Sequence, residues 1–159
     1  MVVVIGVGNY ILGDDGFGIH VIRKMMEMDE FEDVRIVDAM TNSAMLLEAM
    51  DGEDRAIIVD AIDMGQKEGV VVFRFNPNRE DFPSDIMLSL HDLHFRDVIM
   101  MARGVYNLPD EVVIVGVKPE KVEFSLELSD RCLSYVDQVI EVVKKEIGFN
   151  PSERKDKTV

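Results

Sequence analysis

Length, composition and charge exclude several classes of protein. The chain has 159 residues, 47% of them apolar, which is enough for one domain with a full hydrophobic core. Its 17 basic and 31 acidic side chains give a formal net charge of −14, which disfavours nucleic acid and anionic membranes as partners. We expect neither a membrane helix nor a secretion signal, because no apolar run is long enough and no basic segment precedes the first one. The single cysteine, Cys132, excludes an internal disulfide and suits the cytoplasm.

The chain begins with a pattern for a strand, a glycine-containing loop and a helix. Val2–Ile5 is an apolar run typical of a buried strand, and the spacing of apolar residues predicts a helix from Asp14 to about Met28. The two glycines of Gly6–Asn9 allow a tight backbone path at the end of the strand. Of the adjacent carboxylates at the helix start, one could cap the helix while the other, Asp15, faces the crevice. Open α/β sheets bind their ligands at such junctions.

The remaining segments alternate between strand and helix patterns. Strands are expected at Asp33–Asp38, Arg55–Asp60, Gly69–Phe75 and Glu111–Val117, and helices at Ala44–Met50, Ser89–Arg103 and Ser129–Ile147. The loop between Asp60 and Gly69 is too short for a crossover helix, so the strand that begins at Gly69 should run antiparallel at the sheet edge. The irregular stretch Asn76–Leu88 is the longest loop and is typical of a lid or a binding segment.

This alternation predicts one α/β domain over residues 1–148. We expect three layers: a mostly parallel, twisted sheet of five strands, with one antiparallel strand, and helices on both faces. Gly148 should end the last helix, and the charged residues 149–159 should form a tail. The domain is expected to be a monomer. In such a sheet the carboxyl ends of parallel strands share one edge, which brings the first loop beside the end of the strand Arg55–Asp60.

Three side chains are candidates for a metal site at that edge. Asp15 lies in the first junction, Asp60 closes an apolar strand, and His91 follows soon after the start of the helix expected at Ser89. Two carboxylates and an imidazole would make a mixed oxygen–nitrogen site for a divalent ion, with positions left open for water or substrate. The ligand types alone leave zinc, nickel, manganese and iron open. Each residue also has an ordinary structural explanation: a helix cap, a strand end and a packed histidine.

The local sequence around His91 suggests how it would be kept neutral. Ser89–Asp92 has the S-x-x-D pattern of a capping box, which predicts Ser89 as the helix N-cap. A helix N-terminus disfavours imidazolium, so His91 would retain a lone pair for a metal. The other histidines, His20 and His94, are expected to be packed or solvated.

Several motifs, taken together, resemble those of the hydrogenase maturation endopeptidases. They are Gly6-Val7-Gly8-Asn9 followed by Asp14-Asp15-Gly16-Phe17-Gly18, then Val59-Asp60-Ala61, Ser89-Leu90-His91 and Val115-Gly116-Val117-Lys118-Pro119-Glu120. The resemblance extends over residues 1 to about 147. It implies an endopeptidase that removes the C-terminal extension of a [NiFe]-hydrogenase large-subunit precursor once nickel has been inserted.

The resemblance also implies how the metal is used. In that family an acid in the first loop, an acid after the third strand and a histidine contact nickel, and these positions correspond here to Asp15, Asp60 and His91. The nickel would be recognised in the precursor, so the isolated enzyme would be empty, and zinc or cadmium could serve as a surrogate. Because the chain has no Ser-His-Asp pattern, activation of water or of the scissile carbonyl by the metal is the working hypothesis.

One motif departs from the family's pattern. The family often has D-G-G-T after the second strand, where this chain has Asp38-Ala39-Met40-Thr41. Asp38 and Thr41 fit, whereas both glycines are replaced. The departure leaves open which hydrogenase is served and how the substrate tail crosses this loop. Asp38 is a further candidate for orienting the substrate or assisting proton transfer.

Two other interpretations stay open at this point. A receiver-like phospho-acceptor domain, with magnesium bound by the acids, would also have paired acids, an acid closing the third strand and Lys118-Pro119 after the fifth, but it gives His91 no role. A dinucleotide site would use Gly6 and Gly8. Ile11 stands where its third glycine belongs, and the paired acids would repel a pyrophosphate.

Overall fold

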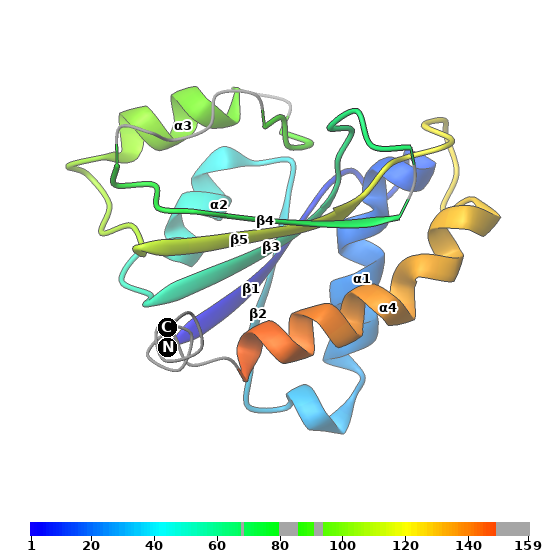
Figure 1. Cartoon of the computed structure of the whole chain (residues 1–159), viewed down its shortest axis with the longest axis horizontal. Helices are drawn as coiled ribbons and strands as arrows, with labels where there is room; N and C mark the ends of the chain where they lie inside the picture. The colour runs from blue at the N-terminus through cyan, green and yellow to red at the C-terminus, as the bar shows by residue number, and fades with distance from the viewer. Residues whose placement is uncertain (68, 80–85, 91–93, 149–159) are drawn as a thin grey trace, which may run out of the picture.

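The computed structural model describes residues 1–67, 69–79, 86–90 and 94–148. Five strands form a single sheet in the order β2-β1-β3-β5-β4 (Figure 1). Their bounds are β1 Val2–Val7, β2 Arg35–Met40, β3 Arg55–Ala61, β4 Val70–Phe75 and β5 Glu111–Val117. The pairs β1–β2, β1–β3 and β3–β5 are parallel, and β4 pairs antiparallel with β5 at the sheet edge. The mostly parallel sheet with one antiparallel edge strand confirms the prediction.

Helices cover both faces of the sheet. They are α1 Phe17–Met26, α2 Ser43–Met50, α3 Phe95–Ala102 and α4 Asp130–Ile147, with short 3₁₀ turns η1 Gly13–Gly16 and η2 Asp29–Phe31. The helices α2 and α3 lie on one face and α1 and α4 on the other (Figure 1). No helix in the described part of the chain is long and apolar enough to span a membrane.

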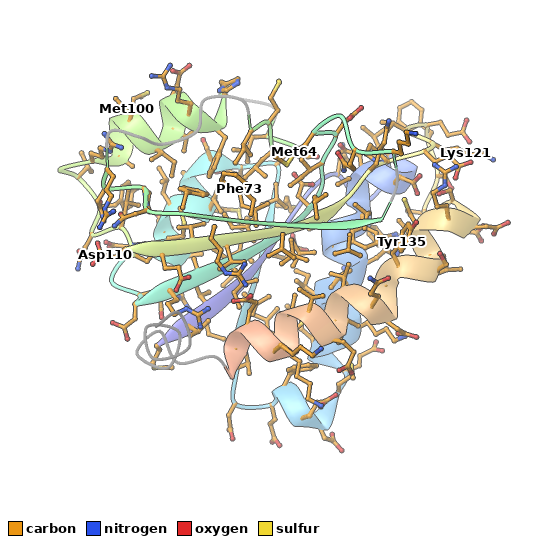
Figure 2. The ribbon with its side chains drawn as sticks, in the orientation of Figure 1. Met64, Phe73, Met100, Asp110, Lys121 and Tyr135 are labelled. Atoms are coloured by element: carbon orange, nitrogen blue, oxygen red, sulfur yellow. The ribbon has the colours of Figure 1, made fainter. Side chains whose placement is uncertain are left out.

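The two faces of the sheet bury separate hydrophobic clusters because side chains alternate along each strand. Along β3, Ile58 packs toward α2 and α3, whereas Ile57 packs toward α1 and α4. The same alternation holds in β5 for Ile114 and Val113. All of β3 is buried, as expected for the central strand of a sheet covered on both faces. Figure 2 shows side chains filling both spaces between sheet and helices.

Several element boundaries differ from the prediction, most of them by one or two residues. The helix α3 begins at Phe95 rather than at Ser89. Its N-cap is His94, whose Nδ1 accepts a hydrogen bond from the N–H of Arg96 at 3.2 Å. The first helix, α1, begins at Phe17, after the 3₁₀ turn η1. The second strand begins at Arg35, two residues late. The predicted tail, residues 149–159, lies outside the described residues.

Candidate active site

Two glycines allow the first loop to lie directly against the sheet. Gly8 has φ +140°, and a Cβ there would lie 2.1 Å from the carbonyl oxygen of Asp15. A Cβ on Gly18 would lie 2.0 Å from the carbonyl oxygen of Val59, in the strand that carries Asp60. A side chain at either position would therefore push the start of α1 away from the strand ends. The glycines bring Asp15 beside the end of β3.

Ser89 joins Asp15 and Asp60, although the three are far apart in sequence. Its backbone N–H donates to Asp60 Oδ2 at 2.6 Å, and its hydroxyl donates to Asp15 Oδ1 at 2.9 Å. The other Asp15 oxygen accepts from the N–H of Asn9 at 3.0 Å, and the other Asp60 oxygen accepts from the N–H of Ala61 at 2.7 Å. The carboxyl edge of the sheet thus brings together two of the three predicted ligands.

Asp60 is fully buried, and this burial raises its pKa well above the ordinary value. The hydrogen bonds from Ser89 and Ala61 act in the opposite direction, while the charge of Asp15 raises the pKa further. A buried carboxyl group beside a second carboxylate is electrostatically suited to receive a cation.

The donor set fits a divalent cation only in part. Each oxygen of Asp15 and Asp60 accepts a hydrogen bond from the described part of the chain, and a carboxylate oxygen has two lone pairs. Oxygen donors of this kind bind divalent ions, but two residues are too few for a closed site. Within the described ranges, no group of three His, Cys, Asp or Glu side chains is arranged to hold a metal. The third predicted ligand, His91, lies outside those ranges.

Asp14 does not cap its own helix, contrary to one of the two roles predicted for the paired acids. Its Oδ2 accepts hydrogen bonds from the N–H groups of Glu120 and Lys121 and from the hydroxyl of Ser129, and its Oδ1 accepts from the N–H of Ser129, all at 2.8 Å. Burial alone would raise the pKa of Asp14, but these hydrogen bonds outweigh it and lower the pKa. Asp14 therefore anchors the loop between β5 and α4.

Asp38 lies apart from the Asp15–Asp60 pair, in a neighbouring pocket of about 340 Å³. The pocket is also lined by Asn9, Tyr10, Met40 and Thr41. Asp38 Oδ1 accepts a hydrogen bond from the N–H of Met40 at 2.9 Å. This bond holds the backbone turn at the end of β2. The predicted part of Asp38 in orienting a substrate stays a prediction.

The other reactive side chains are placed away from the paired carboxylates or are inert. Cys132 is fully buried, and burial raises the pKa of its thiol to about 11, so it is no nucleophile at neutral pH. The ring of His20 stacks on Tyr10 with centroids 4.7 Å apart, and burial lowers the pKa of His20. His20 and His94 are therefore packing and capping residues.

Sequence reasoning missed the role of Ser89. The S-x-x-D pattern indicated a local cap, whereas the serine makes tertiary hydrogen bonds to both carboxylates. The available signal was the position of Ser89, two residues before the candidate His91. Asn9 was noted only as part of a motif, yet its N–H fixes one oxygen of Asp15.

The fold and the site together define the class. This is a three-layer α/β protein with a candidate ligand site at the carboxyl edge of its sheet, built from two carboxylates of separate strand–loop junctions.

Comparison with known proteins identifies the family. The model for the hydrogenase maturation proteases matches residues 19–146, so the chain belongs to that family. The chain is 32% identical over 124 residues to the hydrogenase expression/formation protein HoxM of Cupriavidus necator, an alignment that covers 77% of this chain and 61% of HoxM. It therefore spans about three fifths of the length of that relative.

Solved structures support the same assignment. The hydrogenase maturating endopeptidase HybD of E. coli superposes with a TM-score of 0.70 at 25% identity, covering 89% of this chain and 88% of HybD. The [NiFe] hydrogenase maturation protease HybD of Thermococcus kodakarensis superposes with a TM-score of 0.68 at 25% identity, covering 91% and 97%. The predicted fold class and the resemblance are confirmed.

Proposed function

We propose that this protein is an endopeptidase that removes the C-terminal extension of a [NiFe]-hydrogenase large-subunit precursor after nickel insertion. Membership in the hydrogenase maturation protease family supports the reaction and the kind of partner. The observation that carries the proposal is the convergence of Asp15 and Asp60 on Ser89 at the carboxyl edge of the sheet. The lone cysteine suits a cytoplasmic location for this step.

In this proposal nickel is part of the substrate. Asp15 and Asp60 would contact the nickel of the precursor, with His91 as a third ligand. When bound, the metal would supply Lewis acidity toward the scissile carbonyl. The chain itself contributes orientation, because Ser89, Asn9 and Ala61 fix the four carboxylate oxygens before the substrate arrives. Asp38 would help to orient the substrate from the adjacent pocket.

The receiver interpretation is not favoured. In a phospho-acceptor domain the acids of the first junction must face an open magnesium site. Here Asp14 has no exposed surface, and four hydrogen bonds from the β5–α4 loop occupy its oxygens. Family membership points to a peptidase as well.

The test is processing of purified precursor with and without nickel, followed by mass spectrometry of the shortened product. We expect cleavage only of the nickel-loaded precursor. Asp15→Asn, Asp60→Asn and His91→Ala should each slow cleavage by about 100-fold or more, in the range that well-positioned catalytic groups contribute. The matched control is Asp63→Asn, an exposed acid in the loop after β3, which should process at the wild-type rate. Full processing by the Asp15, Asp60 or His91 variants would disprove the assignment of the site.

A further inference from the structure

The loop between β5 and α4, residues 118–129, exposes large apolar side chains. Val122, Phe124 and Leu126 have 57%, 85% and 59% of their surface exposed. Ile11 is 49% exposed and belongs to the same surface, because its carbonyl oxygen accepts a hydrogen bond from the N–H of Ser125 at 3.0 Å. We call these four residues the apolar ridge.

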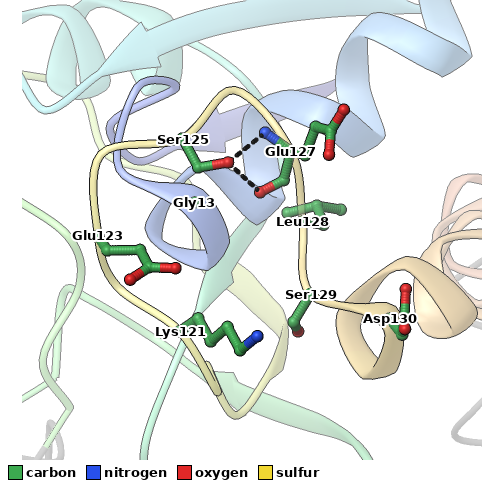
Figure 3. Close-up of a pocket in the computed structure, with 8 residues that line it drawn as sticks. All are labelled: Gly13, Lys121, Glu123, Ser125, Glu127, Leu128, Ser129 and Asp130. Atoms are coloured by element: carbon green, nitrogen blue, oxygen red, sulfur yellow. Dashed lines mark hydrogen bonds between the residues drawn. The ribbon is translucent and has the colours of Figure 1, made fainter.

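The backbone beneath the apolar ridge is firmly held. The N–H of Gly13 donates to the carbonyl of Ser125 at 2.9 Å, and the N–H of Asp14 donates to the carbonyl of Lys121 at 2.9 Å. The carboxyl group of Asp14 accepts from the same loop, as described above. Figure 3 shows the loop running around Gly13, with Ser125 bonded to Glu127. The ridge is therefore exposed on an ordered backbone.

An ordered apolar surface of this kind is suited to binding. The ridge side chains belong to neither hydrophobic core, because about half or more of the surface of each remains in water. A partner that covers them gains the hydrophobic free energy of burial, and little backbone entropy is lost because the loop is fixed beforehand.

Charge indicates which partner the ridge would accept. The cavity of about 240 Å³ beside the ridge is lined by three acids, Glu123, Glu127 and Asp130, and by one base, Lys121 (Figure 3). The whole chain carries −14, so a second copy would bring the same negative field. A partner segment that combines apolar side chains with lysine or arginine would be complementary to this surface.

We propose that the apolar ridge is a docking surface for the precursor, contacting a segment that is apolar and basic. The identity of this partner rests on the proposed function. The ridge adjoins η1, which carries Asp15, so a precursor bound to the ridge would lie beside Asp15 and Asp60. The ridge acts in binding and makes no contact with the reacting bond.

The first test is Phe124→Ser, measured as the Kd for immobilised nickel-loaded precursor and as KM and kcat for processing. We expect Kd and KM to rise about tenfold or more, as for a central apolar interface residue, with kcat unchanged at saturation. Because Phe124 is largely exposed, the thermal unfolding midpoint should stay at the wild-type value. A Kd within twofold of wild type would overturn the proposal.

A matched pair of valines controls for loss of apolar surface in general. Val122→Ser removes a ridge side chain, whereas Val105→Ser removes an even more exposed valine, at 77%, from the turn between α3 and β5. Only Val122→Ser should weaken precursor binding. Equal effects of the two substitutions would contradict a specific surface.

The basic character of the partner is tested by charge. The double variant Glu123→Gln and Glu127→Gln should weaken binding and reduce its salt dependence, whereas the distant, exposed Glu32→Gln should do neither. Sedimentation of the protein alone checks the other occupant: a wild-type dimer that Phe124→Ser dissociates would assign the ridge to self-association and overturn the proposal.

The outcomes separate docking from catalysis. If the precursor binds through the ridge but is not cleaved, the proposed function fails and the docking surface stands. If the precursor is cleaved and Phe124→Ser leaves KM unchanged, the docking surface fails and the proposed function stands.

Discussion

Burial and the neighbouring carboxylate of Asp15 favour the protonated form of Asp60, and they outweigh the opposite effect of the N–H groups of Ser89 and Ala61. Because its pKa is raised on folding, the associated stability is fully present below the ordinary carboxyl pKa and is lost as the pH rises through the folded value. A divalent cation bound by Asp60 would offset this loss of stability, because it stabilises the ionised carboxylate.

We therefore expect a pH-dependent stabilisation by cadmium, used as a surrogate for nickel. The increase in unfolding temperature on adding cadmium should be small at pH 5 and grow toward pH 8, because the cation must displace the proton of Asp60. Differential scanning fluorimetry across this range measures it. Asp60→Asn should show no such growth, and Glu32→Gln should match wild type. A cadmium effect independent of pH in the wild type would refute the prediction.

Asp14 shows the opposite electrostatic behaviour, because its pKa is lowered. Its contribution to stability is therefore present above the unfolded carboxyl value of 3.8 and is lost as the pH falls through the lower folded value. Asp14→Asn replaces one of the two accepting oxygens by an NH2 group, which cannot accept a hydrogen bond. In place of Oδ2 it would face the N–H groups of Glu120 and Lys121, and in place of Oδ1 the N–H of Ser129.

The expected cost of Asp14→Asn at pH 7 is about 3 kcal/mol, since buried donors are left unsatisfied at about 1–3 kcal/mol each. Urea unfolding at pH 7 and at pH 3 measures it. The difference between wild type and variant should shrink at the lower pH, where the wild type loses the same interaction. A difference that is constant with pH would show that the charge of Asp14 does not matter.

At the scale of elements, the end of β2 carries local backbone strain. Met40 has φ +51°, in the left-handed region that glycine adopts without cost. The N–H of Gly8 donates to its carbonyl at 2.8 Å, so the strained residue ties the first loop to the second strand.

Comparing two substitutions isolates this strain. Met40→Gly and Met40→Ala both remove the half-exposed side chain, but only glycine relieves the left-handed backbone. We expect the glycine variant to be about 1 kcal/mol more stable than the alanine variant in chemical denaturation. Equal stabilities would mean that the turn relaxes to a different backbone conformation.

The element scale also shows what could and could not be predicted from sequence. The apolar runs of β1, β3 and β5 and the short loop before β4 indicated the sheet and its antiparallel edge, because burial on both faces leaves a continuous apolar pattern. The start of α3 could not be placed, because the hydrogen bonds of Ser89 go to Asp15 and Asp60 rather than to its own helix. Local patterns do not encode such tertiary partners.

At the scale of the whole molecule, the two clusters on either side of the sheet account for most of the packing that the apolar pattern predicted. The convergence of Asp15 and Asp60 followed from the rule for parallel strand ends. The buried ion pairs of Arg55 with Glu111 and Glu146 had no sequence signal, because the partners lie 56 and 91 positions away. They connect β3 to β5 and to the end of α4.

The net charge of −14 should destabilise the folded chain by self-repulsion at low ionic strength. Raising sodium chloride from 10 to 150 mM shortens the Debye length from roughly 30 to about 8 Å. We expect the unfolding temperature to rise by a few degrees over this range, measured by calorimetry. A variant with Glu123→Lys and Glu127→Lys should rise less. A fall in unfolding temperature would contradict net self-repulsion.

The antiparallel course of β4 determines the side from which Ser89 reaches Asp15 and Asp60. Asp15 follows β1 and Asp60 lies near the end of β3, and these two strands end at the same edge of the sheet. In contrast, β4 runs the other way and leaves Phe75 at the opposite edge, where the side-chain amide of Asn78 donates to the carbonyl of Leu108. Between Phe75 and Ser89 the chain must cover the length of a strand again, roughly 20 Å for six residues, before Ser89 can contact Asp15 and Asp60. Ser89 therefore reaches the two acids from the opposite end of the sheet, whereas the strands themselves place Asp15 and Asp60.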